Sequence, residues 1–199
     1  MQQEIEVKFL NIDLAEVRAN LRVIGAKCEH PMRLMRRVLF DYPDQRFQKN
    51  GHTRRLRVRD EGDKVTTTYK AKNESVYAHE IETTVGSFDD MVEIYKAIGL
   101  DAFSYQESKR ETWKYKNVEI VIDEWPWLDP YIEIEGSDEV SIKEAAKELG
   151  FDWKDSKFGS TDTAYKHQYR GMKEDDLIGD FKEVRFDMPV PKFFKDRIK

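Results

Sequence analysis

The sequence predicts an α+β fold, in which an eight-stranded antiparallel β-barrel forms a tunnel and helices pack on its outside. Three observations lead to this fold class. Eight segments alternate apolar and polar residues, as strands with one buried face do. Most of these segments are joined by short turns, and an even number of hairpin-linked strands favours a meander or a closed barrel. The polar positions of the strands are mostly charged, which indicates that the second face of the sheet has a function of its own.

The first strand is expected at 4–10, where alternation separates apolar residues from charged ones. Ile5, Val7 and Phe9 share one face of this strand, and the charged residues share the other. The other strands are expected at 34–41, 53–60, 64–72, 77–85, 104–115, 118–124 and 131–135. The apolar strand residues expected to lie under helices include Ile5, Val7, Leu56, Val58 and Ile134.

Helices interrupt the strand pattern at three places, each marked by a side-chain cap at its start and a glycine at its end. The expected caps and glycines are Asp13 with Gly25, Ser87 with Gly99, and Ser141 with Gly150; Glu16 and Glu144 complete capping boxes. A last short helix is expected at 160–169. These elements form one domain over residues 1–170, and a tail at 171–199 packs on the domain or is partly disordered.

The composition of the chain reduces the number of function classes that it could belong to. The 199-residue chain has 34 basic and 39 acidic residues, so it has no overall basic field to attract nucleic acid. No apolar run approaches the roughly 20 residues of a membrane span. The one cysteine, Cys28, excludes an intrachain disulfide and fits a reducing compartment. We therefore expect a cytoplasmic protein without nucleic-acid or membrane partners, and a homodimer stays open.

Like charges gather on the polar faces of individual strands. Arg55, Arg57 and Arg59 alternate along one strand, and such a row of like charges repels itself and costs stability. The acidic pairs that share a strand face in the same way are Glu80 and Glu82, Glu119 and Asp123, and Glu133 and Glu135. One strand of this kind usually faces water. The whole set is better explained if basic and acidic rows face each other around a lumen.

A triphosphate bound with a divalent metal ion would compensate the charges of such a lumen. Arginine and lysine bind phosphate oxygens through charge-assisted hydrogen bonds. Carboxylates are the ligands that Mg²⁺ and Mn²⁺ prefer. Phosphoryl transfer depends mainly on positioning and charge neutralisation, so these residue types suffice for catalysis.

The chain opens with the motif Glu4-x-Glu6-x-Lys8. The motifs that follow are Leu56-Arg57-Val58-Arg59, Tyr69-Lys70, Glu80-x-Glu82, Arg110, Asp123 and Glu133-x-Glu135. In this order, over residues 4–165, the set resembles the CYTH superfamily, the triphosphate tunnel metalloenzymes. The resemblance implies an eight-stranded tunnel that binds a triphosphate-containing small molecule with Mg²⁺ or Mn²⁺. Members include class IV adenylyl cyclases, thiamine triphosphatases and inorganic triphosphatases.

The resemblance also assigns roles by position. The expected metal ligands are Glu4, Glu6, Asp123, Glu133 and Glu135. The expected catalytic residues, on the phosphate side, are Lys8, Arg57, Arg59, Lys70 and Arg110. Three further residues are expected in substrate binding: Arg55 extends the basic row outside the family motif, and Glu80 and Glu82 orient the cations or bind a second metal.

Three departures from the family pattern bear on the reaction. Cyclase-like members usually show K-x-R where this chain has Ser108 before Arg110, Arg37 stands where an acidic residue is common, and residues 125–130 replace a glycine-rich segment. These departures favour a metal-dependent triphosphatase acting on inorganic triphosphate or an organic triphosphate. One alternative is a class IV adenylyl cyclase that converts ATP to cyclic AMP and pyrophosphate. An alternative from another class is a non-catalytic protein that binds polyphosphate or nucleotide.

Overall fold

The structure, a computed structural model, describes residues 5–49, 54–72 and 78–197. Its contacts divide the chain into two compact units. The first unit contains Leu34–Glu107 and Leu177–Arg185, and the second contains Glu4–Arg33, Ser108–Asp176 and Phe186–Lys199. Each unit has a hydrophobic core of its own and is described separately.

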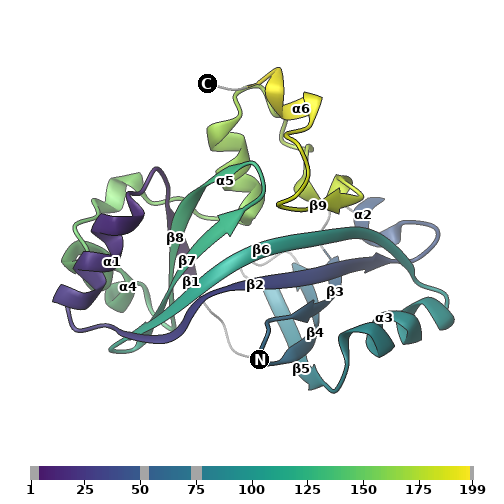
Figure 1. The fold of residues 1–199 in the computed structure, drawn as a ribbon, viewed down its shortest axis with the longest axis horizontal. Helices are drawn as coiled ribbons and strands as arrows, with labels where there is room; N and C mark the ends of the chain where they lie inside the picture. Colours follow the sequence, from purple (N-terminus) through teal and green to yellow (C-terminus); the bar gives the residue numbers. More distant parts are fainter. Residues whose placement is uncertain (1–4, 50–53, 73–77, 198–199) are drawn as a thin grey trace. The chain divides into compact units, whose positions relative to one another are not determined.

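All eight predicted strands are present, in one antiparallel sheet with helices beside it (Figure 1). The strands are β1 (Ile5–Phe9), β2 (Lys27–Asp41), β3 (Arg54–Asp60), β4 (Val65–Lys72), β5 (Ala78–Val85), β6 (Asp101–Tyr115), β7 (Val118–Trp125) and β8 (Leu128–Gly136). Their hydrogen-bonded order is β1-β8-β7-β6-β2-β3-β4-β5. The eight-stranded α+β fold is thus confirmed, although β1 and β5 end this order and the ladders of the described residues do not close a ring.

Strand β2 begins at Lys27, seven residues before the predicted start at Leu34. Pro31 interrupts the alternation of apolar and polar residues there, so the first part of the strand was not predicted. The ladder with β3 covers only Arg36–Phe40, so Pro31 lies outside it and need not donate a hydrogen bond there.

Of the helices in the described residues, those at 14–23, 88–97 and 161–168 begin where the sequence indicated, and those at 46–49 and 192–195 were not predicted. The helices are α1 (Leu14–Val23), α2 (Arg46–Lys49), α3 (Phe88–Ala97), α4 (Glu139–Glu148), α5 (Thr161–Gln168) and α6 (Lys192–Lys195). Asp13 caps α1 by accepting the Glu16 amide at 2.9 Å, and Ser87 caps α3. The predicted cap of α4 was wrong: Asp138 is the N-cap and accepts both the amide and the hydroxyl of Ser141, each at 2.8 Å.

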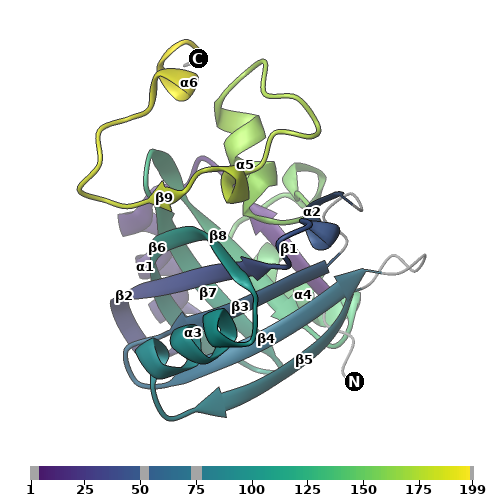
Figure 2. The same cartoon turned by 90° about the vertical axis from the view of Figure 1, so that its right-hand side faces the viewer.

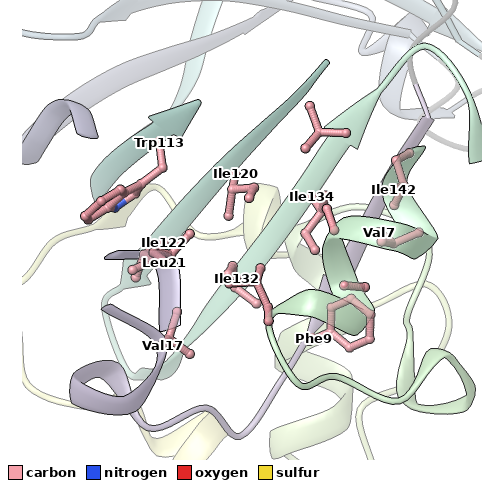
Figure 3. Close-up of a cluster of buried hydrophobic side chains, with 14 residues drawn as sticks. Val7, Phe9, Val17, Leu21, Trp113, Ile120, Ile122, Ile132, Ile134 and Ile142 are labelled. Carbon is pink, nitrogen blue, oxygen red and sulfur yellow. The ribbon is translucent and has the colours of Figure 1, made fainter. Parts of the chain in front are cut away.

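The core of the second unit lies between the apolar strand faces and helices α1 and α4 (Figure 3). Its residues include Val7, Ile120, Ile132 and Ile134 from the strands, Val17 and Leu21 from α1, and Ile142 from α4. Val7 and Ile134 are fully buried, and Ile5 packs at the margin. These apolar positions therefore lie under helices, as the alternation predicted.

The core of the first unit lies between β2, β3 and helix α3, which covers this face of the sheet (Figure 2). Val38 and Val58 pack with Phe88 and Val92 of α3, and Leu56 packs at the margin. In both units the apolar face of the sheet is used for folding. The opposite face carries the charged residues that the sequence predicted for the site.

The segment after α5 contributes short elements to both units. In the first unit, the 3₁₀ turn Ile178–Asp180 buries Ile178, and β9 (Glu183–Val184) pairs parallel with β6 at Tyr105 and Gln106. In the second unit, Phe194 of α6 is fully buried. No helix among the described residues is long and apolar enough to cross a membrane.

Candidate functional site

The charged strand positions form two groups, one in each unit. We call the group on β1, β6, β7 and β8 the carboxylate face; it contains Glu6, Lys8, Arg110, Asp123, Glu133 and Glu135. We call the group on β3, β4 and β5 the cationic face; it contains Arg55, Arg57, Arg59, Lys70, Glu80 and Glu82. Glu4 lies outside the described residues. That both faces line one lumen stays a prediction.

Strand register assembles the carboxylate face. Lys8 of β1 lies opposite Glu133 of β8, and the next row along the same face places Glu6 opposite Glu135. Glu135 in turn lies opposite Glu119 of β7, so three carboxylates follow one another across three strands. Like charges directly opposite one another destabilise a sheet, and a divalent cation would relieve this repulsion.

Lys8 is fully buried, and its ammonium group has three acceptors. Its Nζ lies 2.7 Å from Glu6 Oε1, 3.0 Å from Glu133 Oε1 and 2.5 Å from the carbonyl oxygen of Gly159. Burial alone would lower the pKa of Lys8, but the charges of Glu133 and Glu6 outweigh burial and raise it above its usual value. Lys8 is therefore held as a cation that orders the two glutamates.

Arg110 of β6 forms a bidentate ion pair with the Asp123 carboxylate of β7. Its Nε and Nη2 donate to the two carboxylate oxygens at 2.7 Å and 2.6 Å, and Nη2 also donates to Glu133 Oε2 at 3.1 Å. Glu133 thus accepts from Arg110 on one oxygen and from Lys8 on the other. Burial raises the pKa of Asp123, against the lowering effect of Arg110.

Tyr131 was not predicted as a site residue, although it lies two positions before Glu133 on the same face. It is fully buried, and its hydroxyl lies 3.4 Å from Asp123 Oδ2 and 3.3 Å from the Thr161 hydroxyl at the start of α5. The E-x-E motif drew attention to acidic residues only. Extending its alternation by one step would have found Tyr131.

The residues predicted to bind a metal ion have suitable oxygen donors, but the described ones are not arranged as a metal site. Among the described residues, no three histidine, cysteine or acidic side chains are grouped as a metal-binding cluster. Lys8 and Arg110 instead bind oxygens of Glu6, Asp123 and Glu133. A metal ion would have to compete with these two cations, or bind at the row of Glu6, Glu135 and Glu119.

The cationic face is assembled by register in the same way. Arg55 lies opposite Lys70, which lies opposite Glu80, and Arg57 occupies the next row. Lys70 is well paired, since its Nζ is 3.1 Å from Glu80. Arg59 donates to Glu61 at 3.0 Å and 2.6 Å, and that glutamate had not been predicted.

Arg57 is incompletely satisfied on the cationic face. Its Nη2 lies 3.6 Å from Glu80 and 3.7 Å from Glu82, too far for strong hydrogen bonds. Its Nε is buried and has no hydrogen-bond partner within the described part of the chain. Burial lowers the pKa of Arg57 to about 9, and the neighbouring charge of Arg59 adds to the effect. A charged group in this state favours an incoming anion.

Residues next to the site explain two of the sequence departures. Lys109 points to the strand face opposite Arg110, where its Nζ lies 3.9 Å from Glu124 and 4.6 Å from the centre of the Phe186 ring. Arg37 lies on the face of Arg59 and donates to Gln106 at 2.8 Å and 2.6 Å. Neither residue restores the missing lysine of the cyclase-like pattern.

The segment at 125–130 forms a tight hairpin between β7 and β8. Trp125 is buried, and the indole nitrogen of Trp127 donates to the Met188 carbonyl at 3.1 Å. The Trp127 ring also packs 5.7 Å from the Phe194 ring. Both tryptophans are therefore used in packing.

Comparison with known proteins identifies the family of this chain. The sequence matches the CYTH domain over residues 2–161, which is most of the chain. The chain belongs to the CYTH domain family. Proteins of this family are generally enzymes that bind triphosphate compounds with a metal ion. Among the curated proteins, none matches the chain.

Solved structures share the fold of this chain at low sequence identity. A conserved hypothetical protein from Pyrococcus furiosus is 23% identical, with a TM-score of 0.65, over 81% of this chain and 99% of that one. A putative adenylate cyclase from Vibrio parahaemolyticus is 13% identical, with a TM-score of 0.69, over 83% and 98%. A putative adenylyl cyclase from Hippeastrum is 12% identical, with a TM-score of 0.57, over 84% and 96%.

Proposed function

We propose that this CYTH protein is a metal-dependent triphosphatase that hydrolyses inorganic triphosphate or an organic triphosphate. The observation that carries the proposal is the state of Arg57, a largely buried cation beside Arg59 whose buried Nε has no acceptor within the described residues. Phosphate oxygens supply several acceptors and negative charge together. Arg55, Arg57, Arg59 and Lys70 would bind them, and Glu80 and Glu82 would hold these cations in place.

The carboxylate face would supply the metal ligands. Glu6, Glu133, Glu135 and Asp123, together with Glu4, offer the hard oxygen donors that Mg²⁺ and Mn²⁺ prefer. When bound, such an ion would neutralise phosphate charge and orient the attacking water. Lys8 and Arg110 would keep the carboxylates ordered, and would exchange part of their contacts for phosphate oxygens when the substrate binds.

The side chains that β6 presents on the strand face of Arg110 favour hydrolysis over cyclisation. A cyclase must also seat a base and a ribose so that the 3′-hydroxyl lies in line with the α-phosphate. On this strand Lys109 points away from Arg110, and Ser108 stands where cyclase-like proteins offer a lysine. The Hippeastrum protein, a putative adenylyl cyclase, is described as having a dominant triphosphatase activity. A cyclase-like name is therefore compatible with a hydrolase.

Product analysis tests this proposal. The protein is incubated with inorganic triphosphate or with ATP, in Mg²⁺, in Mn²⁺ and in EDTA, and the products are resolved by ion-exchange chromatography. We expect faster turnover of inorganic triphosphate than of ATP, with orthophosphate and pyrophosphate as products, little cyclic AMP, and no reaction in EDTA. Cyclic AMP as the dominant product from ATP, with inorganic triphosphate untouched, would establish the cyclase instead. Binding without turnover would establish a non-catalytic binding protein.

The matched variants are Ser108→Lys and Lys109→Ser. Because Ser108 shares the strand face of Arg110, Ser108→Lys should change the turnover of ATP more than that of inorganic triphosphate. Lys109→Ser alters the opposite face and should change neither rate appreciably. If the two variants behaved alike, the orientation argument for hydrolysis would be wrong.

A further inference from the structure

Thr66 occupies the cationic face without a folding role for its hydroxyl. It lies in β4 opposite Arg59 of β3 and Thr84 of β5. Only 1% of the residue is exposed, and its Oγ1 has no hydrogen-bond partner within the described residues. A buried hydroxyl without a partner costs free energy that valine, with nearly the same shape, would not cost.

The two threonines that follow Thr66 use their hydroxyls fully. Thr67, on the apolar side of β4, donates to the Arg57 carbonyl at 3.1 Å and shares a 2.7 Å hydrogen bond with the Tyr95 hydroxyl. Thr68, on the cationic face, donates to Glu82 at 2.6 Å. Because Thr67 and Thr68 show what a structural threonine does in this strand, the state of Thr66 calls for a partner that the described residues do not supply.

A second unsatisfied donor lies on the same face, one strand away. Arg57 lies opposite Thr68, so it is the diagonal neighbour of Thr66, and its Nε is buried without a partner in the same part of the chain. Arg59, directly opposite Thr66, adds positive charge to this position. Two unused donors and two cations together suit a ligand that brings acceptors and negative charge, such as the oxygens of a phosphate group.

We propose that the Thr66 hydroxyl donates a hydrogen bond to a phosphate oxygen of the bound triphosphate, next to the oxygen to which Arg57 Nε donates. This inference rests on the proposed function and extends it by one neutral, directional contact. The hydroxyl then discriminates in favour of a ligand with an oxygen at this position, whereas the arginines attract any anion. In the free protein the same hydroxyl lowers stability.

The test uses Thr66→Val with Thr66→Ser and Thr67→Val as matched variants. Affinity for inorganic triphosphate in Mg²⁺ is measured by titration calorimetry, and the Tm of the ligand-free protein by circular dichroism. Thr66→Val should bind about 10-fold more weakly, because a hydrogen bond to a charged group is lost, while its Tm stays level or rises. Thr66→Ser keeps the donor and should recover most of the affinity.

Thr67→Val should show the reverse pattern, with a lower Tm and nearly unchanged affinity, because its hydroxyl is used in folding. If the wild type binds triphosphate and Thr66→Val binds it equally well, the inference is overturned and the proposed function is not. If Thr66→Val lowers the Tm as Thr67→Val does, the hydroxyl has a partner in the free protein and the inference also fails. A wild type that binds no triphosphate at all would overturn the proposed function together with the inference.

Discussion

Buried charges of this protein differ in how completely they are paired, and that difference indicates their roles. Lys8 has three acceptors and Arg110 has two carboxylates, so both are satisfied by the chain itself. Within the described residues, Arg57 has two glutamates at 3.6 Å and 3.7 Å, and the like charges of Arg59 and Arg55 lie near it. A cation that folding leaves unsatisfied lowers stability and favours ligand binding.

We expect Arg57→Met to separate triphosphate binding from stability. Removal of the guanidinium should reduce triphosphate affinity by at least about 100-fold, since a charge-assisted contact worth roughly 3 kcal/mol is lost. The free energy of unfolding without ligand should stay level or rise, because a buried charge beside Arg59 is removed. Calorimetric titration and urea denaturation measure the two quantities.

Arg36→Met is the matched control for this variant. Arg36 lies on the other side of the sheet, where it pairs with Asp60 at 3.0 Å and lies 4.4 Å over the Phe88 ring. This change should cost up to about 1 kcal/mol of stability and leave triphosphate affinity unchanged. A ligand-free Arg57→Met that unfolds more easily than Arg36→Met would contradict our account of Arg57.

At the scale of elements, local signals in the sequence were reliable wherever one face of an element is buried. The alternation of Ile5, Val7 and Phe9 predicts β1 because its apolar face packs under helices. The caps Asp13 and Ser87 mark helices because a side-chain oxygen satisfies a free amide at each start. Ser141 misled the prediction because Asp138, three residues earlier, is the acceptor and the serine is its donor.

Elements too short for a period could not be predicted. The two residues of β9 carry no alternation, and they pair with the part of β6 that lies beyond its ladder with β7. The backbone of Lys157 likewise pairs with that of Lys8, through hydrogen bonds of 2.8 Å and 2.9 Å. Such contacts join positions about 150 residues apart, so no local pattern in the sequence predicts them.

The segment that contacts Lys8 depends on Gly159, which leads to a second prediction. Gly159 has φ +113°, and a Cβ there would lie 2.6 Å from the Thr163 hydroxyl oxygen. Gly159→Ala should therefore cost about 2 to 3 kcal/mol of stability, from backbone strain and from displacement of Thr163. It should also weaken triphosphate turnover, because the carbonyl that holds Lys8 Nζ shifts.

Gly171→Ala is the control that measures the cost of backbone strain without a steric clash. Gly171 also has a positive φ, +87°, but nothing lies within 4 Å of its would-be Cβ. This variant should cost only about 1 to 2 kcal/mol and leave turnover intact. Urea denaturation and steady-state kinetics compare the two, and equal effects on turnover would show that the position of the Gly159 carbonyl does not matter.

At the scale of the whole molecule, the sequence determined which residues are charged and on which strand face, but not which strands are neighbours. Alternation alone suits a meander, whereas β1 lies beside β8 and β2 lies beside β6. The family motifs named most charged residues of the two faces, but not Glu119, Glu61 or Tyr131. The internal pairing of Glu133 with both Lys8 and Arg110 depends on the register of four strands, β1, β8, β7 and β6, which a single sequence does not reveal.

The last prediction concerns how the stability of the molecule depends on pH. The folded protein raises the pKa of Lys8 above its usual 10.5, so folding favours the protonated form. Its contribution to stability should be fully present below pH 10.5, where the unfolded chain is protonated too, and should be lost as the pH rises above that value toward the folded pKa. In Lys8→Met this contribution is absent at every pH. At pH 7 the variant should be about 3 to 5 kcal/mol less stable, because Glu6 and Glu133 lose a buried partner.

The difference between the two proteins is the measured quantity, because the other tyrosines and lysines titrate in both and largely cancel. Urea denaturation from pH 7 to pH 11.5 should give a constant difference in the free energy of unfolding up to about pH 10 and a smaller one above it. A difference that grows with alkaline pH would mean that burial lowers the pKa of Lys8 after all. Glu133 and Glu6 would then hold the lysine too weakly for it to order the carboxylate face.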